Sequence, residues 1–387
     1  MKNGFRILDS DFHVMEPDDL WERYLDEEWK PQAPTFQKDP RFPTSSPSMI
    51  VQGKAIPASS SDAMAAKTRY DLHTRMRKHS SHFEFALERG FDPDTHIQAM
   101  DIEGVDVGVL YSTRGRQIIA HDDLDPRYAI ALCRAYNNWL YDFAQRDPRR
   151  LKLAAQLSFH DPELAAEEAR RAVTELGAVA VIGSPNPVNG RHMHDRGFDT
   201  LWAELEKLRV PLTLHPTGRS SLRDDVGQRF LHHPAYGPIS HAMRNPVESM
   251  LGFASLSMGG VFERFPKLTV AILESTCGWI PWLLWRLDEQ WEKFGPGSDV
   301  KLSAKPSEYF IKNCYIAADV DEDVMKLVID QIGDDLIVLS TDYPHDDSLF
   351  PHAVDSFLGL KQIGESTKRK VLWDNCARLY HLDAQRA

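Results

Sequence analysis

Residues 198–215 read F-D-T-L-W-A-E-L-E-K-L-R-V-P-L-T-L-H, in which a helical pattern is followed at once by a short apolar run that ends on His215. The first part spaces its apolar side chains with the period of an amphipathic helix. The second part, 211–215, has the length and composition of a buried strand. The segment therefore predicts one helix–strand unit of a parallel sheet.

The same alternation recurs along the whole chain. Short β-branched runs predict strands at 5–8, 105–111, 151–157, 178–182, 211–215, 268–273, 314–318 and 336–340. Helical patterns lie between them at 126–145, 162–176, 198–208, 246–253, 280–293, 321–332 and 351–360, and several begin with Pro or Asp. Eight such strands predict an α/β fold of the (β/α)8 type, a TIM barrel, and residues 365–379 predict a terminal helix that closes one end.

Length favours one elaborated barrel over two ordinary domains, because the chain has 387 residues of which 42% are apolar. We expect a single domain over 1–387, with 365–387 as C-terminal helix and tail. Residues 29–75 form a long insertion after the first strand, rich in Pro, Ser and Gln. Loops that follow barrel strands lie on the catalytic face, so this insertion should cover the site as a lid and could contact a second subunit. The alternative is a surface loop without such a role.

Charge and cysteine content limit the partners and the compartment. The formal net charge of -12 comes from 57 acidic and 45 basic residues that are interspersed, without the basic run that would follow a nucleic-acid backbone. The four cysteines are far apart and form no C-x-x-C pair, which argues against both a disulfide framework and a thiolate zinc site. No apolar stretch has the length of a membrane span, so we expect a cytoplasmic protein.

Potential metal ligands stand where three of the predicted strands end. D-x-D-x-H places Asp9, Asp11 and His13 after the first strand, and strand alternation would put all three on one face. The fifth strand ends on His215 and the eighth is followed by Asp342. Catalytic groups of TIM barrels come from strand ends at one face, so Asp11, His13, His215 and Asp342 are predicted to hold a divalent ion. Imidazole and carboxylate ligands suit zinc or manganese, with iron as the alternative.

Five motifs give the chain a resemblance to a known family. They are D-S-D-F-H-V-M-E-P (9–17), M-D-I-E-G-V-D-V-G-V-L-Y (100–111), L-W-A-E-L-E-K-L-R-V-P-L-T-L-H (201–215), G-G-V-F-E-R-F-P-K-L-T-V-A-I-L-E (259–274) and S-T-D-Y-P-H (340–345). Together they resemble the amidohydrolase-related enzymes that include aminocarboxymuconate semialdehyde, resorcylate and carboxyvanillate decarboxylases. The resemblance implies that His13, His215 and Asp342 are metal ligands and that Asp11 fills the first ligand position.

One position departs from this pattern. The resembling decarboxylases end their sixth strand on a catalytic His, where this chain has Glu274. A carboxylate there cannot replace the imidazole as a like-for-like proton donor, but it can act as a general base or as an anionic ligand. With His241 and His345, Glu274 could form a second metal site beside the first. A carboxylate that only caps the next helix is the alternative.

Further polar residues fall in loops predicted to reach the same face. Arg114 and Arg219 could bind a substrate carboxylate, although loop arginines are often only solvated. The remaining candidates are Glu16, His232 and His233. The tryptophan-rich stretch 279–291, W-I-P-W-L-L-W-R-L-D-E-Q-W, has helical spacing and predicts packing on the barrel or a dimer contact.

The leading hypothesis is a metal-dependent hydrolase or decarboxylase-like lyase that acts on a small carboxylated or aromatic substrate, through metal-activated water or a metal-bound substrate. Asp342, together with Glu274 or His241, would carry out the proton transfers of the reaction. The first alternative is a dinuclear non-haem iron oxygenase, a hydroxylase, on the same barrel. The second is an inactive partner subunit of a hetero-oligomer. We expect a homodimer or related oligomer without nucleic-acid or membrane partners.

Overall fold

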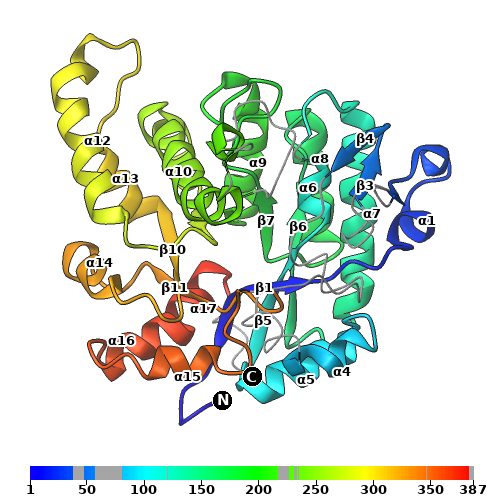
Figure 1. Cartoon of the computed structure of the whole chain (residues 1–387). Coiled ribbons are helices and arrows are strands. Elements are labelled where there is room, and N and C mark those ends of the chain that lie inside the picture. The colour runs from blue at the N-terminus through cyan, green and yellow to red at the C-terminus, as the bar shows by residue number, and fades with distance from the viewer. Residues whose placement is uncertain are drawn as a thin grey trace.

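Eight parallel strands form one sheet that curves into a barrel, and helices cover its outside (Figure 1). The computed structural model describes residues 1–37, 48–56, 81–119, 121–216, 226–230, 233, 235–345 and 347–382. In sheet order the strands are β1 (Leu8–Val14), β5 (Val107–Ser112), β6 (Leu151–Gln156), β7 (Ala180–Gly183), β8 (Leu212–Leu214), β9 (Val270–Ile272), β10 (Cys314–Asp319) and β11 (Ile337–Ser340). The predicted TIM barrel is confirmed.

Two backbone hydrogen bonds close the barrel between its first and last strands. The N–H of Asp342 donates to the carbonyl oxygen of Asp11 (3.2 Å), and the N–H of His13 donates to that of Tyr343 (2.6 Å). Both bonds join β1 to the residues that directly follow β11. The seam therefore lies beside two of the predicted metal ligands and fixes their backbones relative to each other.

The outer layer consists of helices that follow the strands in chain order. They are α1 (Leu20–Tyr24), α4 (Glu84–Leu87), α5 (Pro93–Glu103), α6 (Gly115–Ile119), α7 (Pro126–Ala144), α8 (Pro162–Thr174), α9 (Asp199–Leu208), α10 (Tyr236–Met258), α11 (Val261–Arg264), α12 (Ile280–Phe294), α13 (Pro306–Asn313), α14 (Met325–Ile332) and α15 (Ala353–Leu358). Before α5, α7 and α8 an Asp side chain accepts hydrogen bonds from first-turn N–H groups, and Pro follows it. The predicted starts are confirmed at α7 and α8, whereas α5 was not predicted.

Two predicted elements differ most from the structure in their bounds. The first strand is Leu8–Val14 rather than 5–8, because its polar side chains point into the protein and hide it from a search for apolar runs. The helix predicted at 246–253 begins ten residues earlier and contains Pro246 in its interior. Pro is common at the first position of a helix, so the sequence predicts a helix start at Pro246. In the structure it lies inside the helix instead.

The C-terminal segment closes the bottom of the barrel, as predicted. Helix α16 (Glu365–Arg369), a π-helical turn (Lys370–Asp374) and α17 (Asn375–Leu379) follow one another along the chain. Cys376, Leu379 and Tyr380 pack in one buried cluster with inward-facing strand residues. Those strand residues are Leu8, Val109, Ala154, Ala180, Ala271, Ala317 and Val338. The site must therefore open at the opposite end, where the strands finish.

Part of the predicted insertion forms a small antiparallel sheet of β2 (Thr35–Gln37), β3 (Ser48–Val51) and β4 (Lys54–Ile56). Met49 and Val51 are buried in the outer core, and the hydroxyl of Tyr128 on α7 donates to the carbonyl of Gln32. The described part therefore packs against the helical layer. Residues 38–47 and 57–75, on which the predicted lid largely depends, lie outside the described residues.

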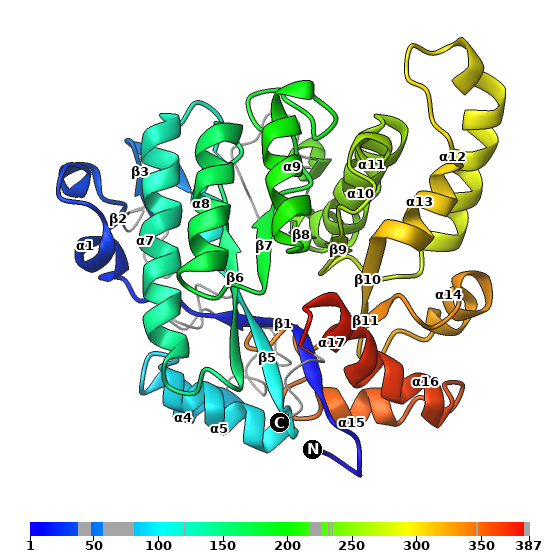
Figure 2. The same cartoon turned by 180° about the vertical axis from the view of Figure 1, so that it is seen from behind.

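The tryptophan-rich helix α12 stands at the edge of the molecule in both views (Figures 1 and 2). Ile280, Leu283 and Leu284 are buried against the barrel layer, whereas Trp282 and Trp285 are 56% and 58% exposed. One face thus packs on the barrel, and the other presents large aromatic side chains to solvent. Among the described residues, no helix has both the length and the hydrophobicity that crossing a membrane requires.

Candidate metal centre

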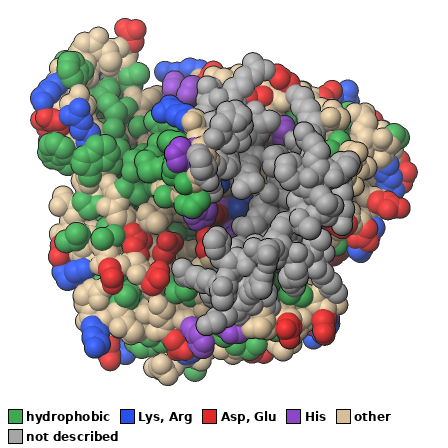
Figure 3. Space-filling model, in the orientation of Figure 1, with side chains coloured by type: hydrophobic (Ala, Val, Ile, Leu, Met, Phe, Trp, Pro, Cys, Tyr) green, Lys and Arg blue, Asp and Glu red, His purple; other side chains and the backbone are tan. Residues whose placement is uncertain are grey.

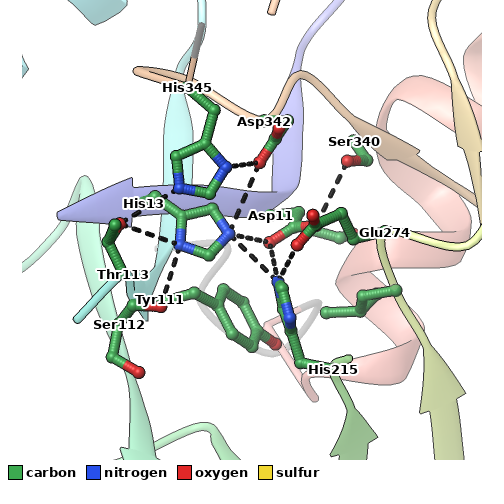
Figure 4. A network of polar contacts seen from close by, with 12 residues as sticks. Asp11, His13, Tyr111, Ser112, Thr113, His215, Glu274, Ser340, Asp342 and His345 are labelled. Carbon is green, nitrogen blue, oxygen red and sulfur yellow. Dashed lines mark hydrogen bonds and ion pairs between the residues drawn. The ribbon is translucent and has the colours of Figure 1, made fainter. Parts of the chain in front are cut away.

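Four side chains from three separate strands meet at the open end of the barrel (Figure 4). Asp11 and His13 belong to β1, His215 follows β8, and Asp342 follows β11. Asp11, His13 and His215 are at most 1% exposed. Their backbone positions follow from the barrel, since parallel strands end at a common face.

A β-bulge in β1 turns Asp11 and His13 toward this group. The register of β1 against β5 shifts between Asp9 and Phe12. Leu8 packs in the cluster inside the barrel, whereas Phe12 packs in the outer one, so the alternation of faces is broken between them. The prediction that Asp9 shares a face with Asp11 and His13 is wrong for this reason. Asp9 instead accepts hydrogen bonds from the N–H of Asp11 and from Thr341.

Backbone carbonyls fix which ring nitrogen of each histidine faces the group. Nδ1 of His13 lies 3.1 Å from the carbonyl oxygen of Ser112, and Nδ1 of His215 lies 3.1 Å from that of Pro216. A carbonyl only accepts, so Nδ1 of His13 carries the proton and its Nε2 has a lone pair, whereas Nη1 of Arg116 lies within 2.7 Å of both ring nitrogens of His215. The two Nε2 atoms are 3.0 Å apart. Ligands about 2.1 Å from one ion and at right angles would be separated by about this distance.

The carboxylates complete the arrangement. Oδ1 of Asp11 lies 3.1 Å from Nε2 of His13 and 3.4 Å from Nε2 of His215, and Oδ1 of Asp342 lies 3.5 Å from Nε2 of His13. Both oxygens are buried, and neither has a hydrogen-bond partner among the described residues. Buried anionic oxygens that face imidazole lone pairs require a positive charge between them. These four residues therefore fit a divalent cation.

Burial and neighbouring charges shift the pKa values of these groups in opposite directions. Burial lowers the pKa of His13, and the charge of His345 adds to this effect, so the ring stays neutral. Burial would raise the pKa of Asp11, but His215 and His13 outweigh it and hold that pKa below its usual value. Burial, then Glu274, Asp347 and Asp11, raise the pKa of Asp342. A neutral His13 ring beside an ionised Asp11 is the combination of protonation states that metal binding needs.

Glu274 and His345 both join this group. Oε2 of Glu274 lies 3.1 Å from Nε2 of His215, and Nδ1 of His345 lies 2.6 Å from Oδ1 of Asp342. Asn245 Nδ2 donates to the other oxygen of Glu274 at 3.1 Å. Glu274 and Asp342 have φ values of 46° and 55°, in the left-handed region that non-glycine residues rarely adopt. Such strain is common at functional positions, where the surroundings enforce it.

His241 lies apart from the other residues predicted for a second metal. Its Nε2 is 3.2 Å from Oδ2 of Asp347, and its side chain is 59% exposed. Asp347 is the largest cause of a rise in the pKa of His241 to about 9. His241 therefore lines the cavity as a charged group paired with Asp347, a partner that the sequence reading did not identify.

Arg116, which the sequence reading missed, takes the place expected for Arg114. Nη1 of Arg114 donates to Oδ1 of Asp18 at 2.6 Å and so points away from the metal group. Nη1 of Arg116 lies 2.5 and 2.7 Å from the ring nitrogens of His215 and 3.2 Å from Oε2 of Glu274. The sequence S-T-R-G-R contains both arginines just after β5, but only the start of α6 at Gly115 decides which one turns inward.

The remaining candidates have structural roles or no described position. The carboxylate of Glu16 accepts hydrogen bonds from the N–H groups of Thr113, Arg114 and Gly115, and so shapes the loop after β5. His233 is exposed, and its Nδ1 accepts from Ala235 N–H. Arg219 and His232 lie outside the described residues.

A cavity of about 230 Å³ opens beside the metal group. Its wall includes Glu274 and Asp342 together with Asn245, His241 and Asp347. The volume lies below the range of pockets that hold drug-sized molecules, which favours a small ligand.

Comparisons with known proteins agree with this arrangement. The model of an amidohydrolase family matches residues 73–382. A gamma-resorcylate decarboxylase of Rhizobium sp. (strain MTP-10005) is 31% identical over 305 residues, which cover 75% of this chain and 87% of that protein. An amidohydrolase of Mycobacterium avium subsp. paratuberculosis K-10 superposes with a TM-score of 0.77 at 22% identity, over 97% of this chain and 99% of the other. A dihydroxybenzoic acid decarboxylase of Polaromonas sp. JS666 was solved with manganese and the inhibitor 2-nitroresorcinol. It superposes with a TM-score of 0.66 at 22% identity, over 99% of this chain and 98% of the other.

Proposed function

The chain belongs to the amidohydrolase family of metal-dependent TIM-barrel enzymes, and from that premise we propose that it removes CO₂ from a small aromatic carboxylate without using an oxidant. The observation that carries this proposal is the placing of Arg116 beside the group of Asp11, His13, His215 and Asp342. A buried guanidinium next to a cation site offers two adjacent positive charges for a carboxylate and a neighbouring oxygen.

The proposed metal ligands are Asp11, His13, His215 and Asp342, with manganese as the ion that a similar decarboxylase contains. When bound there, a divalent cation supplies Lewis-acid polarisation of substrate oxygens. Both histidines lie against backbone carbonyl oxygens, and outer contacts of this kind change metal affinity or activity by about 10–100-fold. The ligand set contains no cysteine, which fits an ion that prefers oxygen and nitrogen.

The protein side chains supply orientation and a proton. Arg116 would pair with the substrate carboxylate. The ring carbon that bears this carboxylate takes a proton, the carbon–carbon bond breaks, its electron pair returns to the ring, and CO₂ leaves. Glu274 stands where the resembling decarboxylases have a catalytic His, so a carboxyl group must take over proton transfer.

The test uses the manganese-loaded protein with 2,6-dihydroxybenzoate and 5-carboxyvanillate, which similar decarboxylases are named for. We expect one CO₂ for each substrate molecule lost, at equal rates under nitrogen and in air. The His215→Ala variant is the matched control and should release none. Turnover only in air, with consumption of oxygen, would overturn the proposal in favour of the oxygenase hypothesis, which none of the comparisons given above supports. Hydrolysis of amides or esters without CO₂ release would favour the hydrolase.

We also propose that the protein forms a homodimer through the exposed apolar face of α12 and its neighbours. Exposed large apolar side chains gather there: Met243, Leu251, Trp282, Trp285, Ile311 and Leu327. Hydrophobic side chains cluster over the same side of the molecule in the space-filling view (Figure 3). Apolar patches of this kind on a globular protein mark contact surfaces.

A further inference from the structure

His345 has a buried position that the first metal group does not use. The residue is 5% exposed and lies over His13, with ring centroids 4.1 Å apart. Its Nε2 lies 3.1 Å from Oγ1 of Thr113, and its Nδ1 lies 2.6 Å from Oδ1 of Asp342. The threonine hydroxyl can accept from Nε2–H, and in that tautomer the Nδ1 lone pair is left for a cation shared with the carboxylate oxygen. Such an outer partner is the usual device that orients a metal-binding imidazole.

Two donors orient Glu274 toward the metal group. Asn245 donates to Oε1 and Arg116 donates to Oε2, which also lies 3.1 Å from Nε2 of His215. The ligand atoms of His13, Glu274, Asp342 and His345 all lie within 4.8 Å of one another. The first group, formed by Asp11, His13 and His215, meets the same criterion separately. Two overlapping sets of potential ligands thus share one wall of the barrel mouth.

Oδ1 of Asp342 lies between the two sets. It is 3.5 Å from Nε2 of His13 on one side and 2.6 Å from Nδ1 of His345 on the other. The atom is buried and has no hydrogen-bond partner among the described residues. An acceptor in this position, between two imidazole nitrogens, can be satisfied by a cation on each side.

We infer that the chain binds a second divalent cation, held by Glu274, Asp342 and His345, with Asp342 bridging it to the first. Ions that share a bridging carboxylate in protein sites are about 3.5–4 Å apart. One imidazole and two carboxylates suit manganese, iron or zinc rather than a soft metal. The inference goes beyond the proposed function, which needs a single ion.

Charge at the cavity supports two ions rather than one. The carboxylates that line the cavity belong to Glu274, Asp319, Asp321, Asp342 and Asp347. The positive groups facing them are Arg116 and His241, and His241 is already paired with Asp347. One divalent ion would leave several carboxylates uncompensated in a partly buried cavity, where uncompensated charge is costly.

The decisive experiment counts manganese in the full chain after metal removal and reloading with excess Mn²⁺, and records its electron paramagnetic resonance spectrum. We expect two ions per chain and a spectrum of exchange-coupled Mn²⁺. His345→Ala and Glu274→Gln should each retain one ion with the six-line spectrum of isolated Mn²⁺. His241→Ala, which changes a cavity residue outside the ligand set, is the matched control and should keep two.

Either of two results would overturn the inference: one uncoupled ion in the saturated wild-type chain, or two coupled ions in both His345→Ala and Glu274→Gln. Circular dichroism of each variant separates loss of a ligand from loss of the fold, and two ligand variants guard against one failing to fold. The readout is metal content and spin coupling, so it does not depend on turnover. Failure of the proposed decarboxylation would leave the ion count unchanged, and the two outcomes remain distinguishable.

Discussion

The Nε2 atoms of His13 and His215 are 3.0 Å apart, although 202 positions separate the residues in sequence. The carbonyl of Ser112 holds the proton of His13 on Nδ1, so Nε2 faces His215 with its lone pair. Oδ1 of Asp11 and Oδ1 of Asp342 are buried in the same group without a hydrogen-bond partner among the described residues. Buried acceptors that face one another in this way repel unless a cation lies between them, which makes the group a strong site for a metal.

Replacing His215 by Ala removes one of these two imidazoles. Metal content should fall by at least one ion per chain, because the first site loses one of its two imidazole ligands. Loss of several kcal/mol of Lewis-acid stabilisation predicts a decrease in kcat of about 10³-fold or more. Elemental analysis and a CO₂-release assay measure the two effects. His233→Ala, an exposed histidine outside the group, should change neither, and full activity in His215→Ala would contradict the proposed ligand set.

Arg116 and Arg114 offer a matched pair for testing substrate binding. Arg116→Gln should raise KM with a smaller effect on kcat, because a charge-assisted hydrogen bond to a carboxylate contributes about 1.5–3 kcal/mol, or about 10–100-fold. Arg114→Gln removes a pairing with Asp18 and should change KM little, while lowering thermal stability. Steady-state kinetics on both variants make the comparison. A larger increase in KM from Arg114→Gln than from Arg116→Gln would instead assign binding of the substrate carboxylate to Arg114, as the sequence predicted.

Sequence alone predicted the barrel and the residues that meet at its mouth. Strand ends carry the information: an apolar run that stops at His215 marks both the strand and the ligand. The β1 bulge could not be predicted, because nothing in D-S-D-F-H shows where alternation breaks. Because the bulge was not predicted, regular alternation placed Asp9 on the same face as Asp11 and His13. Asp9 instead pairs with Thr341.

Residues in loops were harder to place than residues in strands. Arg114 and Arg116 are two positions apart, and the choice between them depends on the first turn of α6 and on Asp18. His241 was grouped with Glu274 and His345 because all three flank the predicted mouth. Its pairing with Asp347 depends on the course of the chain after β11, which local pattern does not determine.

The ion pair of His241 and Asp347 predicts a pH dependence of stability for the metal-free protein. Hydrogen bonding to Asp347 raises the pKa of His241 from 6.5 to about 9. The contribution of His241 to the stability of the folded protein is therefore complete below pH 6.5 and is lost as the pH rises through 9. The pKa of Asp347 is about 2, lowered by His241 against the effect of burial, so its contribution is present above 3.8 and lost toward pH 2. The ion pair therefore contributes most to the stability of the folded protein between about pH 4 and 6.5.

Thermal melting of the wild-type chain and His241→Gln measures this contribution. The difference in Tm should be largest near pH 6 and should vanish by about pH 10, where the histidine is neutral in both folded and unfolded chains. A difference that stays constant from pH 6 to 10 would show that His241 acts through packing rather than through charge.

The exposed aromatic face of α12 predicts the oligomeric state. Trp282 and Trp285 are each more than half exposed, while the opposite face of the helix is buried on the barrel layer. Burying two indole rings against a second copy would remove a large apolar area from water, so light scattering should show a dimer. Trp285→Glu places a charge at that contact and should shift the chain to monomer, with the fold retained because the side chain leaves the core untouched. Arg149→Glu, at an 89% exposed side chain elsewhere, should leave the dimer intact. A wild-type chain that stays monomeric at high concentration would leave this face without the proposed partner and rule out the homodimer.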